Sequence, residues 1–529
     1  MTATAYIPTS STSSLRKWLL KALAALGAAA TLLYGLAAID AAVVNYRSTY
    51  DPTIAEQRLS MQRAAEAGQD LGSPGDIASH SNVLVAMMAS VGTPLHAFGK
   101  QGLSESWIHY TTMPRANIVA IAMHSMLAGT AMLFGALQFW PAFRRNYPRW
   151  HRGFGLAYMV LVQTAMIAAA IYLLRTPVHL IYDQLTFYVG LWVLDVGVTV
   201  TLWLSIHALV RKRIAQHQAW MALNFGMLLT APIQRYGWIA FAAVAPEGMR
   251  QLEANYAVSG MLIPLSFMIG YGLYTLNRLL QADQPKALLT RVHASFQPHA
   301  RLGRVVAMVM QLVLAASMVT TVQHFVFDLG LTSASNSNAL IPHSVLQLDQ
   351  QIMASAPVTR WLFVLGTLTG LLSAMVWLWG TTFRSNGDIT SRDTAWAGWA
   401  LSLGTAMVGL ALWQWGLQWG MPSFTAQHGG ALHLFGGTMA LIFATLLATA
   451  LARGQENWAK EWSWFAIACL VATPSFFLLL PIMGNVGMPE HYVTAGHAYR
   501  LAAYGQWTSL VTAFVVSVYS PATHAKLAR

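Results

Sequence analysis

The sequence predicts an all-α integral membrane protein with about twelve transmembrane helices in two six-helix halves. Of the 529 residues, 56% are hydrophobic and only 9% are charged, whereas a soluble protein of this length carries about 25% charged residues. Apolar runs of roughly 20 residues, the length that crosses a bilayer as a helix, recur along the whole chain. These runs lack the strand-like alternation that is typical of a transmembrane β-barrel.

The apolar runs define the expected spans, with boundaries good to about 2–4 residues. The first run is longer than the apolar core of a secretory signal peptide, so we expect it to stay in place as the first helix. The expected spans cover residues 18–45, 116–141, 154–175, 184–210, 219–244, 257–280, 304–327, 359–382, 395–420, 429–453, 462–484 and 502–522.

The spans group into two halves. The first half covers residues 1–281 and the second covers 304–529, with the inner linker 282–303 between them. In each half a long outer segment follows the first helix, at 46–115 and at 328–358. Twelve spans in two halves of six is also a common layout of secondary transporters.

The chain is basic, with 31 Lys and Arg against 19 Asp and Glu and a net charge of +12. The basic residues gather in short loops on alternate sides of the spans, which is the positive-inside pattern rather than a nucleic-acid surface. This pattern predicts that both termini are cytoplasmic, and the lipid bilayer is the expected partner. The loops that carry it contain Arg144, Arg145, Arg149 and Arg152, then Arg211, Lys212 and Arg213, then Lys286, Arg291, Arg301 and Arg304.

Two classes of chemistry are excluded by the sequence. The single cysteine, Cys469, lies in an apolar run and rules out an intrachain disulfide, a CxxC site or a thiolate-held iron–sulfur cluster in this chain. No phosphate-binding loop, GxSxG, HExxH or dinucleotide fingerprint is present. We therefore expect no nucleotide-driven chemistry.

Three ionisable residues lie inside spans of the first half: His124, Asp195 and Arg235. Such residues are rare in membranes and usually functional. Each lies roughly 12–16 Å from the outer end of its span, at about 1.5 Å per residue. We expect them to meet at one level and to bind a quinone or relay protons. The alternative is that Asp195 and Arg235 only neutralise each other.

A second group of histidines lies on the inner side. His151 begins the third span, His207 is near the inner end of the fourth and His217 begins the fifth. Two facing imidazoles are enough to ligate a b-type haem, and Arg149 and Arg152 are placed to pair with its propionates. The alternative is an interfacial histidine among arginines that contact lipid head groups.

The second half carries histidines mostly on the outer side. They come from three segments that are distant in the chain, and with nearby methionines they suit copper, zinc or a second haem. The alternative is ordinary interfacial packing. The candidate ligands are His324, His428, His433, His491 and His497.

Part of the first half resembles a known family. The segments "HSMLAGTAMLFGALQFWPAFRRNYPRWHRGFGLAY", "HALVRKRIAQHQAWM" and "QRYGW", within residues 124–238, resemble a family of predicted bacterial membrane proteins of unknown function. The chain departs from that pattern at Ala222, where a polar or basic residue is usual, and in carrying a second half. The layout is similar to membrane cytochromes b and ferric-reductase-like bundles, which implies a bacterial inner membrane and haem chemistry.

Three functions are compatible with these patterns. The first is an inner-membrane oxidoreductase or electron carrier, with haem b at His151 and His217, copper or a second haem on the outer side, and a quinol donor. Other redox subunits are possible partners of such a protein. The second is a proton-coupled secondary transporter with an Asp195–Arg235 coupling site. The third is a scaffold subunit without a cofactor.

Overall fold

The computed structural model describes residues 10–73, 76–77, 81–98, 113–181, 183–244, 251–281, 300–328, 330–333, 340–383, 392–421 and 429–519. Within these ranges every regular element is a helix, and eleven helices are long and apolar enough to cross a membrane. This confirms the predicted class of an all-α membrane protein. Helices dominate because the bilayer core offers no water to satisfy backbone N–H and C=O groups, and a helix satisfies them internally.

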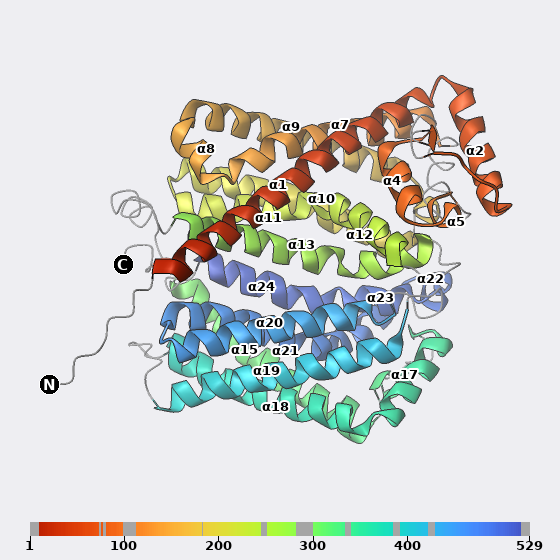
Figure 1. Cartoon of the computed structure of the whole chain (residues 1–529). Coiled ribbons are helices and arrows are strands. Elements are labelled where there is room, and N and C mark those ends of the chain that lie inside the picture. Colours follow the sequence, from red (N-terminus) through yellow and green to blue (C-terminus); the bar gives the residue numbers. More distant parts are fainter. Residues whose placement is uncertain are drawn as a thin grey trace.

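The first half contains long helices that form a bundle and short ones that cover one end of it (Figure 1). Its elements are α1 (Ser10–Arg47), α2 (Pro52–Glu66), α4 (Val83–Val91), α5 (Pro94–Phe98), α7 (Arg115–Gln138), α8 (Pro141–Asn146), α9 (Pro148–Arg175), η1 (Val178–Leu180), α10 (Gln184–Val210), α11 (Ile214–Leu228), α12 (Thr230–Val244) and α13 (Gln251–Gln281).

The helices of the second half pack beside those of the first, and α13 and α24 lie along the boundary (Figure 1). The elements are α15 (Ala300–Val322), η2 (Gln323–Phe327), η3 (Gly330–Ser333), α17 (His343–Ser355), α18 (Pro357–Leu378), η4 (Trp379–Phe383), α19 (Arg392–Trp419), α20 (Ala431–Ala452), α21 (Glu456–Gly484), α22 (Glu490–Thr494), α23 (His497–Ala503) and α24 (Gly505–Tyr519).

The two ends of the bundle differ. At one end lie the short helices α2, α4, α5, α17 and α22, and we call it the capped end (Figure 1). At the other end lie α8, the start of α1 and the end of α24, and we call it the basic end. The arginines that follow α7 and α10 belong to this basic end, as the sequence pattern predicts for one side of a membrane.

Eleven of the twelve expected spans correspond to single membrane-length helical stretches, and one does not. The expected span 219–244 is divided into α11 and α12, each of 15 residues, with a break at Leu229. Pro232 explains the break, because proline has no N–H to donate to the carbonyl four residues earlier and its ring crowds that carbonyl. After the break, α12 packs against α13 and α4 of the first half.

A buried ion pair joins the two halves near the basic end. The Arg278 guanidinium of α13 donates to both carboxylate oxygens of Glu461 of α21, at 2.6 and 2.9 Å. The hydroxyl of Tyr271 donates to the same carboxylate at 2.7 Å and accepts from the Trp462 indole at 3.0 Å. Both charged side chains are less than a tenth exposed, so each depends on the other for its compensation.

Removing one charge of this pair tests its contribution to stability. We expect Glu461→Gln to lower the free energy of unfolding by about 3–5 kcal/mol, because it leaves the Arg278 guanidinium buried without a counterion. Glu456→Gln on the same helix is the matched control, since Glu456 pairs with Lys460 where the carboxylate is 41% exposed and should cost less than about 1 kcal/mol. Thermal unfolding in mild detergent measures both, and equal small shifts would contradict the expectation.

Candidate functional site

A cavity of about 660 Å³ lies inside the first half. Its walls come from α1, α7, α9, α10, α12 and α13, with contributions from η1, the end of α11 and the start of α4. His179 and Leu180 of η1 line the cavity and are exposed, which places its mouth at the capped end. Val198, which also lines it, lies about 21 Å along α10 from the start of that helix. The cavity therefore extends well into the membrane-spanning part of the bundle.

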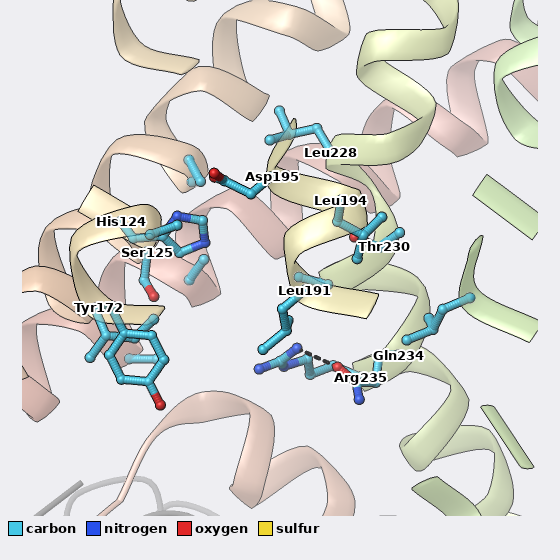
Figure 2. Close-up of a pocket in the computed structure, with 18 of the residues that line it drawn as sticks. His124, Ser125, Tyr172, Leu191, Leu194, Asp195, Leu228, Thr230, Gln234 and Arg235 are labelled. Atoms are coloured by element: carbon cyan, nitrogen blue, oxygen red, sulfur yellow. Dashed lines mark hydrogen bonds between the residues drawn. The ribbon is translucent and has the colours of Figure 1, made fainter. Parts of the chain in front are cut away.

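The structure brings His124, Asp195 and Arg235 together around this cavity (Figure 2). They come from α7, α10 and α12, which are separated in the chain and adjacent only in the folded bundle. In Figure 2 the Asp195 carboxyl and the His124 ring point to the same part of the cavity, while Arg235 lies on its other side. Three residues singled out as rare intramembrane ionisable groups thus share one site.

The His124 ring is oriented by a backbone contact. Its Nδ1 lies 3.0 Å from the carbonyl oxygen of Ala165 on α9. A carbonyl only accepts, so the neutral imidazole carries its proton on Nδ1 and leaves Nε2 as an acceptor. His124 is therefore suited to accept a hydrogen bond or a proton from a molecule in the cavity.

The alternative in which Asp195 and Arg235 neutralise each other is not what the structure shows, since no ion pair among the described residues joins them. Instead, Arg235 Nη1 donates to Gln234 Oε1 at 2.8 Å, and the guanidinium lies 5.0 Å from the centre of the Trp238 ring. Gln234 and Trp238 both donate to Asn255 Oδ1, at 2.7 and 2.8 Å. This hydrogen-bonded group holds the guanidinium toward the cavity and away from Asp195.

Asp195 is the least compensated group of the cavity. Its side chain is 9% exposed, and its Oδ1 atom is buried without a hydrogen-bond partner among the described residues. Leaving a buried polar atom unpaired is costly, and such an atom commonly marks a place where water, an ion or a ligand binds. A carboxyl held in this way is a good acceptor for a proton or a hydrogen bond from a ligand.

Several cavity residues were missed by the sequence analysis, which considered only ionisable groups. Gln234 and Asn255 position Arg235, and the hydroxyl-bearing Tyr172 and Ser125 line the wall next to His124 (Figure 2). The sequence signal that could have identified these residues is a polar side chain inside an apolar span, because such groups usually form hydrogen bonds with a neighbouring helix. Asn82 lies in the outer segment after the first helix and carried no such signal.

The inner histidines are only partly brought together. His217 of α11 and His151 at the start of α9 lie close enough to interact electrostatically, and Arg144 lies near both. His217 Nδ1 contacts the backbone oxygen of Ser205 at 3.1 Å and its hydroxyl at 2.8 Å. His207 is exposed on α10 and does not join this pair.

The surroundings of this histidine pair contain further unsatisfied atoms. His151 Nδ1, Gln138 Nε2 and Gln216 Nε2 are buried without hydrogen-bond partners among the described residues. Arg144, which the sequence analysis did not single out, donates to the Gln138 carbonyl at 3.1 Å and to Asn277 at 2.7 Å. The predicted haem-pairing residues Arg149 and Arg152 are exposed at the basic end.

His491 and His497 lie close enough to interact electrostatically, whereas His324 and His433 lie in separate surroundings. His324 stacks on Phe477 with ring centres 4.4 Å apart, and His433 stacks on Trp419 at 5.8 Å. His497 is buried and hydrogen-bonded, whereas His491 is exposed. His428 lies outside the described residues.

The described parts of the chain contain no group of three or more His, Cys, Asp or Glu side chains arranged to hold a metal ion. The copper or second-haem site stays a prediction of the sequence, and no step of the proposed function depends on it.

Comparison with known proteins links the first half to one family. Residues 121–269 match the family described as predicted membrane protein (DUF2306). Neither the curated proteins nor the solved structures contain a match to the chain. The matched segment runs from α7 into α13 and includes His124, Asp195 and Arg235 together with the His151–His217 pair. The chain is thus a multi-span membrane protein, and its cavity-bearing part is similar to a membrane family of unknown function.

Proposed function

We propose that the first half is a membrane oxidoreductase module that oxidises a quinol in the cavity. His151 and His217 would hold a b-type haem, which would take the electrons one at a time for transfer to an outer electron acceptor. The observation that carries the proposal is the convergence of His124, Asp195 and Arg235 on one cavity of about 660 Å³. This volume lies within the roughly 300–1,000 Å³ range of small-molecule sites. An imidazole, a carboxyl and a guanidinium in an otherwise apolar cavity suit a ligand with a polar head and an apolar body.

The chemistry of quinol oxidation matches these groups. Oxidation of a quinol to a quinone releases two protons and two electrons. The Asp195 carboxylate and His124 Nε2 would accept the proton of the nearer ring hydroxyl, since neither is engaged by another described residue at the accepting atom, and the proton of the second hydroxyl would leave to water through the cavity mouth. The Arg235 guanidinium donates to the second ring oxygen, and the leucines at 191, 194 and 228 form an apolar wall for the ring and tail.

The electrons released by the quinol need an acceptor in the chain. The residues at the basic end are of the types that hold a bis-histidine haem. Ser205 engages His217 Nδ1, which leaves Nε2 to ligate a metal, as is usual for haem and zinc histidines. The unpaired His151 Nδ1 and the neighbouring Arg144 supply a second imidazole and a cation for a propionate. A bound haem would supply one-electron chemistry at this place.

Quinone binding tests the cavity. We expect the chain in lipid nanodiscs to bind a short-tailed ubiquinone or menaquinone analogue, and Arg235→Gln to weaken that binding about 10–100-fold, because a charge-assisted hydrogen bond is lost. Asp195→Asn should retain binding and slow quinol oxidation, because a proton acceptor is lost. Val196→Ala, which changes a lipid-facing neighbour on α10 that is 52% exposed, is the control. Binding that is indifferent to Arg235→Gln would exclude this ligand site.

A visible spectrum tests the haem. We expect the dithionite-reduced minus oxidised spectrum of the purified chain to show Soret and α bands at near-stoichiometric haem content. His151→Ala with His217→Ala should abolish these bands, and His207→Ala, at an exposed histidine, should leave them unchanged. Full haem content in the double variant, or a flat spectrum of the unmodified chain, would overturn this part of the proposal.

The uncompensated carboxyl also favours a second candidate, a proton-coupled transporter. A carboxyl that faces a cavity without an ion-pair partner can bind and release a proton as a ligand moves. In proteoliposomes that contain a pH-sensitive dye, Asp195→Asn should then abolish proton movement, and Glu490→Gln, at an exposed acidic residue of α22, should not. Proton movement in a protein without haem bands or quinone binding would favour this candidate over the oxidoreductase.

A further inference from the structure

The chain between η1 and α10 adopts an unusual backbone conformation. Asp183 and Gln184 have φ angles of 49° and 42°. Two successive non-glycine residues in the left-handed region are uncommon, and they persist only where the surrounding structure holds them. The residues that hold this segment come from the other half of the protein.

Arg500 of α23 is the centre of that contact. Its Nη2 lies 3.0 Å from Asp183 Oδ1, and the two side chains are only 5% and 11% exposed. Its Nε donates to the Thr186 hydroxyl at 3.1 Å, and Nη2 donates to His497 Nδ1 at 2.9 Å. The Thr186 hydroxyl oxygen lies 2.7 Å from the same His497 nitrogen. Burial raises the pKa of Asp183 to about 6, against the lowering effect of Arg500.

A second contact joins Tyr504 to Thr186 and to Gly190, which lies one turn further along α10. The Tyr504 hydroxyl donates to the Thr186 carbonyl at 2.7 Å. A Cβ at Gly190 would lie 2.7 Å from the same hydroxyl oxygen, so only glycine allows this approach. We call the group formed by Asp183, Thr186, His497, Arg500 and Tyr504 the latch. A buried ion pair adds little net stability over apolar packing, but it fixes the geometry of the groups that it joins.

The chain on either side of Asp183, which the latch holds, forms part of the cavity mouth. Ile181 and Phe187, on either side of Asp183 in the chain, both line the cavity. The exposed His179 and Leu180, just before them, form its rim. The chain that lines the entrance is therefore held from the second half, across the boundary between the halves.

We propose that the second half controls access to the cavity: the latch holds residues 179–181 and 183–187 in a conformation that restricts the mouth, and its release opens the mouth. Arg500 is then a positioning residue that acts through Asp183 and Thr186 and touches no ligand itself. This inference rests on the proposed function only in taking the cavity as a ligand site. It also gives the second half a role in a protein whose family resemblance is confined to the first.

Thiol labelling of a cavity residue tests the latch without any ligand. Ser125→Cys in a Cys469→Ala background places one thiol on the cavity wall, and a small water-soluble methanethiosulfonate is the probe. We expect Arg500→Gln to speed labelling roughly tenfold, the factor that corresponds to about 1.4 kcal/mol in the opening equilibrium. Arg500→Lys should restore part of the slow rate. Tyr504→Phe, which removes one hydrogen bond, should act in the same direction with a smaller effect.

Arg278→Gln is the matched control, because it breaks the other buried ion pair between the halves, far along α13 from the mouth. It should destabilise the protein without changing the labelling rate. The proposal would be overturned if the labelling rate were unchanged or slower in both Arg500→Gln and Tyr504→Phe. Equal acceleration by Arg278→Gln would also overturn it. Because the assay reports access to the thiol and not quinone binding, failure of the latch and failure of the quinol site give different results.

Discussion

The separation of Asp195 from Arg235 is the constraint on which the site depends. Two opposite charges in one membrane cavity would ordinarily pair, since an unpaired ionisable group is costly in a bilayer. Here Gln234, Trp238 and Asn255 hold the guanidinium on one side, and the carboxyl remains uncompensated on the other. The cavity therefore presents a cation and a proton acceptor at different places, which a ligand with two polar ends can bridge.

The bend between α11 and α12 makes this arrangement possible. Proline at 232 divides a helix that would otherwise run straight through the membrane. The part after the bend carries Arg235 to the cavity, and the part before it carries His217 at the basic end. One divided helix thus contributes to both candidate sites. Along α10, the cavity carboxyl Asp195 and the histidine partner Ser205 are separated by about 15 Å, so both sites share the same helices.

The two halves are joined by polar contacts near both ends of the bundle. At the basic end, Arg278 and Glu461 form a buried pair with two hydrogen bonds between them, supported by Tyr271. At the capped end, Arg500 and Asp183 form a pair that holds a strained segment beside the cavity mouth. The first contact is suited to stability and the second to control of position, because only the second lies next to a space that a ligand enters.

The sequence was sufficient for the fold class, for the approximate place of eleven of the twelve expected spans, and for singling out His124, Asp195 and Arg235, which line one cavity. Apolar run length and the cost of charge in a bilayer are local properties, and each can be assessed from a short stretch of chain. Whether Asp195 and Arg235 pair, which histidines approach one another, and which half holds the cavity mouth depended on the folded bundle. His207 faces outward and Arg500 reaches across to Asp183 because of helix rotation and packing between segments more than 300 residues apart, and no periodicity along the chain encodes those contacts.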